Sequence, residues 1–197
     1  MSRATSPKPA ATPAYACQLR LGRPGVRLVL APPVLEWTLG PRQGTLPLAD
    51  IAALRLTWRP GQLMKASHHL EITARDGLRL EVGSVSRVSI AGVRDQGPEY
   101  AAFVRALHGA LAAAGARPRC LAGFAPWRWW SMVALAAVSV TAALAVVLRA
   151  GEETRWSALL FFGFLFALVA VPALTAIVRN RPDTYAPDRI PERLLPG

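Results

Sequence analysis

Apolar and polar residues alternate with a period of two in seven short segments of the first half of the chain. In the first segment Tyr15, Cys17 and Leu19 would share one face of a strand, and the polar residues between them would share the other. Such alternation is typical of half-buried β-strands. We therefore expect strands at residues 15–21, 26–30, 35–39, 54–59, 70–75, 78–82 and 85–90.

The strongest local signal is a β-hairpin. The alternating segments 70–75 and 78–82 are separated by the dipeptide Asp76-Gly77. Asp-Gly favours a two-residue turn of type I′, in which both central residues take a positive φ. The sequence therefore predicts a tight hairpin that turns at these two residues.

One amphipathic helix follows the predicted strands. Pro98 and Glu99 favour a helix start, because proline there needs no donor and a carboxylate faces the positive end of the helix dipole. Gly115 is a suitable C-terminal cap. The apolar residues of this helix share one face, which we expect to pack onto the strands: Tyr100, Phe103, Val104, Leu107 and Leu111.

Two long apolar runs dominate the second half of the chain. Residues 129–148 and 156–178 contain no ionisable side chain, and as helices they would be about 30 and 34 Å long, enough to cross a hydrocarbon core of roughly 30 Å. Buried helices of a soluble bundle are the alternative, but they usually carry a polar stripe. Aromatic and basic residues at the ends of the runs are typical of membrane-interface anchors: Trp127, Arg128, Trp129, Trp130, Trp156, Arg179 and Arg181.

These features divide the chain into successive segments. We expect a disordered tail at 1–14, a cytoplasmic domain at 15–116, a linker at 117–128, transmembrane helices at 129–148 and 156–178, an extracytoplasmic connector at 149–155 and a cytoplasmic tail at 179–197. Two basic residues, Arg149 and Arg155, lie in the connector, whereas seven flank the helical pair: Arg117, Arg119, Arg128, Arg179, Arg181, Arg189 and Arg193. The positive-inside rule therefore places both termini in the cytoplasm.

Three stretches of the chain resemble the pleckstrin-homology-like (PH-like) superfamily, in particular bacterial PH-like domains attached to transmembrane helices. They are VRLVLAPPVLEWTLGPRQGTLPLADIAALRL, LEITARDGLRLEVGSV and YAAFVRALHGALAAAG. The C-terminal NRPDTYAPDRIPERLLPG is similar to the tails of small alphaproteobacterial inner-membrane proteins. The resemblance implies an α+β protein: a seven-stranded antiparallel β-sandwich or barrel closed by a C-terminal helix, followed by a two-helix transmembrane hairpin.

The chain departs from phosphoinositide-binding PH-like domains in one loop. Those domains use a basic loop between their first two strands, and here that loop is short. Arg20, Arg23 and Arg27 are its only cations. The fold serves lipid binding, peptide binding and scaffolding alike, so the resemblance does not select among these functions.

Composition and charge add a class of partner. The chain of 197 residues is 52% hydrophobic and 18% charged, and its formal net charge is +11. This apolar content excludes intrinsic disorder for most of the chain, and the positive charge implies an anionic neighbour such as phospholipid or nucleic acid. The cations are scattered over the chain and no nucleic-acid reading motif is present, so we expect no nucleic-acid partner.

The sequence contains no enzyme, cofactor or metal signature. His68 and His69 are adjacent, so in a strand they point to opposite faces and cannot chelate one metal together. His108 falls at the border of the apolar stripe of the helix, and we interpret all three histidines as residues of the core edge or the surface. Glu36, Glu71 and Glu81 occupy strand positions that face outward, and Cys17 and Cys120 are expected to be reduced and buried.

The basic residues are the best candidates for binding. One interpretation is a solvated basic surface that supports topology and solubility. The other is a patch that faces lipid headgroups, because each cation near an anionic leaflet adds about 1 kcal/mol of attraction. The loop from Trp58 to Lys65 combines aromatic, apolar and basic groups, so the residues expected to contact headgroups or a partner are Arg20, Arg23, Arg27, Trp58, Arg59 and Lys65.

These observations favour a multi-pass inner-membrane protein without enzymatic activity. Its PH-like domain would act as a binding or scaffold module that contacts anionic lipid headgroups or a membrane partner. The alternative is an accessory or assembly subunit of a larger inner-membrane complex, in which the domain contacts protein. Anionic membrane lipids are the expected partners, and a membrane-protein partner or a second copy of the chain remains open.

Overall fold

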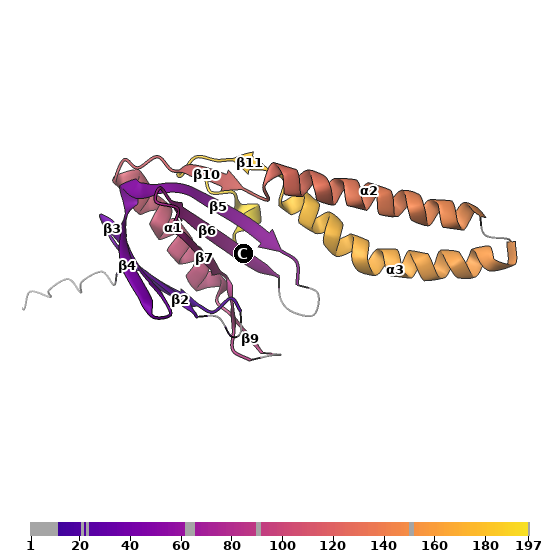
Figure 1. Cartoon of the computed structure of the whole chain (residues 1–197), viewed down its shortest axis with the longest axis horizontal. Helices are drawn as coiled ribbons and strands as arrows, with labels where there is room; N and C mark the ends of the chain where they lie inside the picture. Colours follow the sequence, from indigo (N-terminus) through magenta and orange to yellow (C-terminus); the bar gives the residue numbers. More distant parts are fainter. Residues whose placement is uncertain are drawn as a thin grey trace, which may run out of the picture.

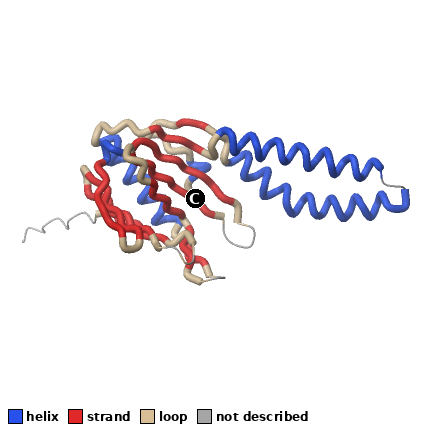
Figure 2. Tube along the Cα trace, viewed as in Figure 1, coloured by secondary structure: helices blue, strands red, loops and turns tan. Residues whose placement is uncertain are grey.

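The computed structural model describes residues 12–20, 22, 24–61, 66–89, 92–149 and 152–196. The chain is a mixed α+β protein in which several β-sheets and one helix form a domain, and two long helices extend from that domain side by side (Figure 1). Figure 2 separates the strand-rich part from the helical part clearly. Within α3, the side chains of residues 152–155, 158, 162, 165–167 and 169 lie outside the description.

The first sheet has four antiparallel strands in sequence order. They are β1 (Ala14–Cys17), β2 (Val26–Ala31), β3 (Val34–Leu39) and β4 (Arg42–Pro47). In β2, buried Val26, Leu28 and Leu30 alternate with residues that are more exposed, as the period of two in the sequence predicts. A short 3-10 helix, η1 (Leu48–Asp50), connects this sheet to the second one.

The second sheet has the strand order β11-β10-β5-β6-β7. Its antiparallel centre consists of β5 (Ile51–Arg59), β6 (Ser67–Ala74) and β7 (Arg79–Gly83). β10 (Arg119–Ala122) pairs in parallel with β5, and β11 (Asp183–Thr184) pairs with β10. A separate two-stranded sheet contains β8 (Val85–Arg87) and β9 (Val93–Asp95).

Helix α1 (Gly97–Ala113) contributes one apolar face to the core between these elements. The five predicted stripe residues, Tyr100, Phe103, Val104, Leu107 and Leu111, are all buried. The hydroxyl of Tyr15 in β1 donates a hydrogen bond to the carbonyl of Gly83 in β7 at 2.6 Å, and its ring stacks on Phe103. Tyr15 therefore joins both sheets to the helix.

Helices α2 (Pro126–Arg149) and α3 (Glu152–Arg179) contact each other along the part that projects from the domain. None of the residues of α2 is buried. Trp129 in α2 donates a hydrogen bond from Nε1 to the carbonyl of Ile177 in α3 at 2.8 Å, so the two helices are tied together at the domain end.

Several sequence expectations differ from this structure. The hairpin between β6 and β7 turns through Arg75, Asp76 and Gly77, and only Gly77 has a positive φ, so the turn is not of type I′. The amide of Gly77 bonds to the carbonyl of Ala74 at 3.1 Å, and that of Ala74 to the carbonyl of Leu78 at 2.9 Å. This is a turn followed by a glycine bulge, which tolerates a negative φ at Asp76.

The segments on either side of the helical pair also differ from the expected linker and tail. Residues 117–128 contain β10 and the start of α2, and residues 179–197 contain β11 and the 3-10 helix η2 (Glu192–Leu194). Leu194 and Leu195 are buried in the same core as α1. The segment after α3 therefore returns to the domain, because its leucines complete the apolar interior. The expected strand at 85–90 is shorter, and 1–11 of the expected N-terminal tail lie outside the described residues.

Candidate functional site

The domain end nearest the long helices is held to α3 by one buried side chain. Asn180, the residue after α3, has no exposed surface. Its Oδ1 accepts a hydrogen bond from the amide of Trp58 at 2.8 Å, and its Nδ2 donates to the carbonyls of Trp58 at 2.7 Å and Ala176 at 2.9 Å. The amide group of Asn180 thus continues the hydrogen bonding of β5 into the end of α3.

A close backbone approach holds α2 at the same place. Gly123 lies between β10 and α2 with a φ of 75°, and any Cβ there would collide with the backbone of Asn180 and Arg181. Its amide donates to the carbonyl of Leu56 at 2.8 Å, and the amide of Phe124 donates to the carbonyl of Asn180 at 3.1 Å. Both helices therefore leave the domain from one fixed point.

Two arginines at this point lie on aromatic rings. The guanidinium carbon of Arg179 is 5.0 Å from the centroid of the Trp58 ring, and that of Arg128 is 4.3 Å from the centroid of Phe124. A cation over a ring face is attracted by the negative face of the π system. Within the described residues, neither arginine has a carboxylate within 4.0 Å. These cations are thus positioned by rings and left without a fixed counterion.

A polar network crosses the nearby face of the second sheet. Glu81 Oε1 accepts hydrogen bonds from Arg59 at 2.7 Å and from His69 Nδ1 at 3.0 Å, and His69 Nε2 lies 2.9 Å from the hydroxyl of Ser67. The hydrogen bond from His69 and the charge of Arg59 lower the pKa of Glu81 to about 2, against burial that raises it. Burial lowers the pKa of His69. The network fixes Arg59 at the end of β5.

Ser67, His69 and Glu81 stand in the order hydroxyl, imidazole, carboxylate that a nucleophilic serine requires. Two features of the geometry favour a positioning role instead. Glu81 also binds Arg59, so the negative charge of Glu81 is held in an ion pair. The groove of the domain lies elsewhere and is lined by other residues. Catalysis needs hydrogen-bond donors aimed at a developing oxyanion as well as a nucleophile and base.

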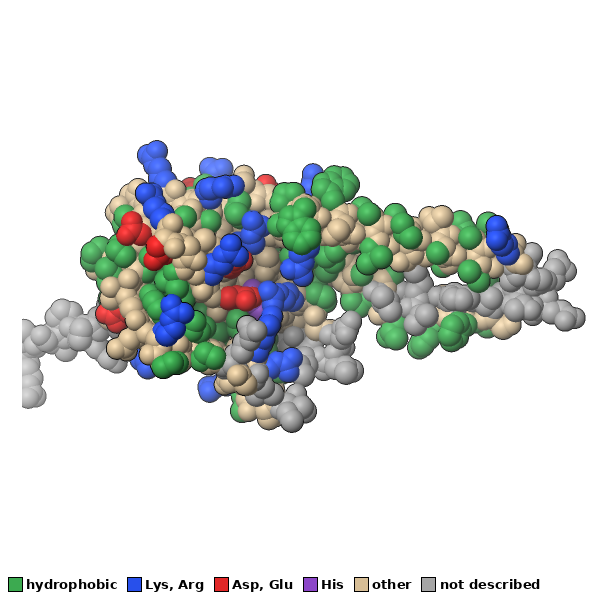
Figure 3. All heavy atoms as spheres, viewed as in Figure 1, with side chains coloured by type: hydrophobic (Ala, Val, Ile, Leu, Met, Phe, Trp, Pro, Cys, Tyr) green, Lys and Arg blue, Asp and Glu red, His purple; other side chains and the backbone are tan. Residues whose placement is uncertain are grey.

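Electrostatic effects on the two histidines show that several cations gather here. Arg59 and Arg20 both lower the pKa of His69, after burial as the larger cause. Burial, and then the charge of Arg179, lower the pKa of His68 to about 4. Figure 3 shows arginine side chains grouped where the domain meets the helices. We define the basic collar as Arg20, Arg59, Arg128 and Arg179.

The expected contact residues lie in different parts of the structure. Arg20 and Arg59 belong to the basic collar, whereas Arg27 is exposed on β2 in the other sheet. Trp58 is buried in β5, so it does not belong to an exposed loop, and its ring instead supports Arg179. Arg23 and Lys65 lie outside the described residues.

The expected interface anchors lie at the ends of the long helices. Trp127 and Trp130 at the start of α2 are 75% and 63% exposed, and Trp156 near the start of α3 is 74% exposed. Trp129 is half-buried because its indole bonds to α3, and Arg181 is exposed just after that helix. The indole groups thus lie at both ends of the helical pair.

Helix α2 is long and apolar enough to cross a membrane. The mean hydropathy of its 18-residue apolar segment is 2.4, and no residue of that segment is buried. Among the described residues it is the one helix that meets this criterion. The helix gives weak support for membrane association of the chain.

Four residues of this site were not among the expected contacts. His68 and His69 were interpreted as core-edge or surface residues, and both are buried. Glu81 was expected to face outward, and Asn180 was placed in a tail. The alternation of β6 and β7 does place His69 and Glu81 on one sheet face, but the sequence carries no signal for Asn180. Within the described part of the chain, no group of three or more His, Cys, Asp or Glu is arranged to hold a metal ion.

Comparisons of the chain with protein-family models, with curated proteins and with solved structures give no match. The resemblance to PH-like domains therefore stays a prediction from the sequence.

Proposed function

We propose that the chain is a membrane-anchored binding or scaffold protein without enzymatic activity, whose PH-like domain contacts anionic lipid headgroups. In this proposal α2 and α3 form a two-helix transmembrane hairpin in an inner membrane. The domain and both termini lie in the cytoplasm. The basic collar lies in the headgroup layer, where phosphate groups act as the counterions of Arg128 and Arg179.

The contact between Arg179 and Trp58 carries this proposal. Arg179 is the last residue of α3, and Trp58 is nearly the last residue of β5, so one guanidinium marks both the end of the helix and the near end of the domain. Asn180 and Gly123 fix that junction. A hairpin that spans the bilayer would therefore hold the basic collar at headgroup level in a single orientation.

The exposed tryptophans also support a position of the basic collar at headgroup level. Trp127 and Trp130 lie one helical turn or less from Arg128, and indole groups favour the interface between hydrocarbon and water. Trp156 would lie near the opposite interface. The seven basic residues that flank the helical pair, against two in the connector, support a cytoplasmic location for the domain.

The strand order supports the PH-like assignment. Four antiparallel strands, β1 to β4, are followed by three, β5 to β7, then by the two-stranded sheet of β8 and β9, and then by the amphipathic helix α1. The seven strands β1 to β7 and the helix α1 are consistent with the order that the resemblance implies, with β8 and β9 inserted before the helix. β10 and β11 extend the second sheet beyond that order.

Cysteine labelling tests the topology. The native Cys17 and Cys120 are buried, so single exposed cysteines can be introduced at Arg149 and at Asp188 and compared. A membrane-impermeant maleimide added to intact spheroplasts should label Arg149→Cys at once and Asp188→Cys only after permeabilisation. Labelling of Asp188→Cys in intact spheroplasts would contradict the orientation.

Hydrogen exchange tests the headgroup contact. The full chain is placed in nanodiscs of phosphatidylglycerol or of phosphatidylcholine, and exchange is followed at the ends of β5 and β6. We expect slower exchange in phosphatidylglycerol at low salt, and loss of the difference in the double variant Arg20→Gln/Arg179→Gln or at high salt, which screens exposed charges. Arg75→Gln/Arg94→Gln is the matched control, because both residues are exposed cations outside the basic collar.

Equal exchange in the two lipids would contradict headgroup recognition. In that case the second candidate, an accessory or assembly subunit of a membrane complex, makes a different prediction. A stoichiometric protein partner should co-purify with the wild-type chain in mild detergent, and the Arg20→Gln/Arg179→Gln variant should release it.

A further inference from the structure

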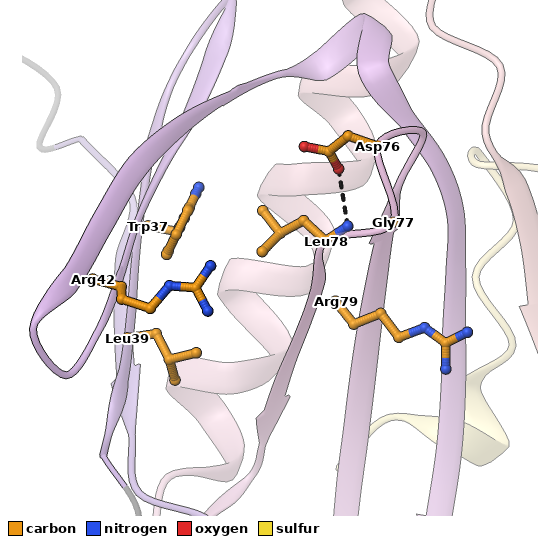
Figure 4. A pocket seen from close by; sticks show the side chains of 7 residues that line it. All are labelled: Trp37, Leu39, Arg42, Asp76, Gly77, Leu78 and Arg79. Atoms are coloured by element: carbon orange, nitrogen blue, oxygen red, sulfur yellow. Dashed lines mark hydrogen bonds between the residues drawn. The ribbon is translucent and has the colours of Figure 1, made fainter.

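The domain carries an open groove between its two sheets, well away from the basic collar. It has a volume of about 460 Å³ and lies between the β3–β4 hairpin and the turn that joins β6 to β7 (Figure 4). The residues that line it are Trp37, Leu39, Arg42, Asp76, Gly77, Leu78 and Arg79. Volumes of this size are typical of small-molecule sites. Figure 1 places β3 and β4 on the side of the domain away from α2 and α3.

One wall of the groove is a flat aromatic surface. Trp37 in β3 lies opposite Gly44 in β4, where a Cβ would come within 2.9 Å of the indole. Glycine at this position therefore allows the ring to lie close against the neighbouring strand. Leu39 and Leu78 are half-buried and continue the apolar surface below and across from the ring (Figure 4).

A single guanidinium is directed into the groove. In Figure 4 the side chain of Arg42 extends between Trp37 and Leu39 toward Leu78, whereas that of Arg79 points away. Arg42 has no carboxylate within 4.0 Å among the described residues. Asp76 also lines the groove, where its Oδ1 accepts a hydrogen bond from the amide of Leu78 at 2.9 Å. The groove thus offers an apolar wall and, in Arg42, a cation that forms no ion pair with the described residues.

We propose that this groove binds a carboxylate attached to a flat apolar group. The carboxylate pairs with Arg42, whose planar guanidinium matches two carboxylate oxygens, and the flat group lies on Trp37 between Leu39 and Leu78. The same chemistry is present in a free aromatic acid and in the C-terminal phenylalanine of a peptide. The site lies on the opposite side of the domain from the hairpin, so its ligand approaches from water, independently of the proposed headgroup contact.

Calorimetric titration of the full chain in phosphatidylcholine nanodiscs tests the proposal, with empty nanodiscs as the blank. The probes are 2-naphthoate and its uncharged analogue 2-naphthylmethanol. We expect saturable binding of 2-naphthoate, and affinity about tenfold weaker for the alcohol, because the charge-assisted hydrogen bond is lost. N-acetyl-Gly-Gly-Phe as free acid and as C-terminal amide forms the second pair and identifies a peptide as the source if it binds more tightly than the naphthoate.

Three variants locate the binding. Arg42→Gln should weaken the two acids about tenfold and leave the two neutral probes unchanged, and Trp37→Leu should weaken every probe. Arg94→Gln, an exposed cation on β9, should change none of them. Circular dichroism in the near ultraviolet checks that each variant is folded. The proposal is overturned if neither acid binds up to about 10 mM, or if Arg42→Gln binds both acids as the wild type does.

Discussion

Leu107 in α1 and Leu144 in α2 are both helical leucines, yet the first has no exposed surface and the second is 55% exposed. The difference holds along both regions. In the domain the apolar residues face inward from two sheets and one helix, whereas in the helical pair large apolar residues face outward along most of α2. An apolar surface of this extent on a water-soluble protein would be unusual. The hydrophobic effect therefore acts on both regions, but it is mainly in the domain that other parts of the chain cover the apolar side chains.

The largest expected effect comes from a matched pair of leucine truncations. Leu107→Ala should lower the free energy of unfolding of the domain by about 2–5 kcal/mol, because it leaves a cavity in a packed core. Leu144→Ala should change it by less than about 0.5 kcal/mol, since this residue is far from the domain core. Denaturant unfolding of the full chain in nanodiscs, followed by near-ultraviolet circular dichroism, measures both. Equal losses would contradict the separation of the two regions.

Asn180 joins the two regions, so its removal should affect both. Asn180→Ala leaves the amide and the carbonyl of Trp58 without their partners in a buried position. The expected cost is about 2–3 kcal/mol, by the usual penalty for buried unsatisfied polar groups. Hydrogen exchange should accelerate at the end of β5 and in the last turn of α3, while β2 and β3 stay protected. Acceleration spread evenly over the domain would indicate global unfolding instead of a loosened junction.

His68 makes the stability of the domain depend on pH. Burial and Arg179 lower its pKa to about 4 in the folded state, whereas an unfolded histidine titrates near its ordinary value of about 6.5. The unfolded chain therefore binds more protons between these values, and stability is present above about pH 6.5 and is lost as the pH falls toward 4.

Replacement of His68 should remove its contribution to the dependence of stability on pH. His68→Leu should be more stable than the wild type at pH 5 by about 2 kcal/mol, because the buried ring no longer resists protonation. The buried ring nitrogens of His68 have no hydrogen-bond partner among the described residues, so leucine leaves nothing unsatisfied there. His69 and His108 also have lowered pKa values, so a smaller slope of the same sign should remain. Chemical unfolding from pH 5 to pH 8 measures the difference, and identical slopes would rule out this role of His68.

The smallest expected effect concerns the ring contact at the junction. Arg179→Met keeps an unbranched side chain over Trp58 but removes the charge, which should cost about 0.5–1 kcal/mol of stability. Arg189→Met, an exposed arginine after α3, is the control and should be neutral. Thermal unfolding of both variants in the same nanodiscs measures the difference in stability. Equal stabilities would show that the cation–π contact does not stabilise the junction.

The sequence was informative where the structure depends on neighbours in the chain. Alternation located β2, β3, β6 and β7, and the spacing of apolar residues in α1 identified five of the eight residues that it buries. The same alternation placed Trp58 on the apolar face of its strand, which conflicts with its assignment to an exposed loop, and the structure follows the alternation.

The remaining elements depend on contacts distant in sequence. β10 and β11 are four and two residues long, and each exists because a strand far away in the chain offers a free edge. Short strands of this kind have no pattern of their own. The amide of Asn180 meets Trp58 across 122 positions, and no local signal indicates such a pairing. The basic collar is likewise a property of the folded chain, because its four arginines come from four different segments.

The return of the chain to the domain after α3 has a consequence for the order of synthesis. Asn180, Leu194 and Leu195 are synthesised after both long helices, and all three are buried in or against the domain. Until then a nascent domain lacks part of its interior and one partner for β5. Completion of the domain thus waits for the synthesis of both long helices, and a chain interrupted before Asn180 would expose an unfinished core to cellular proteases.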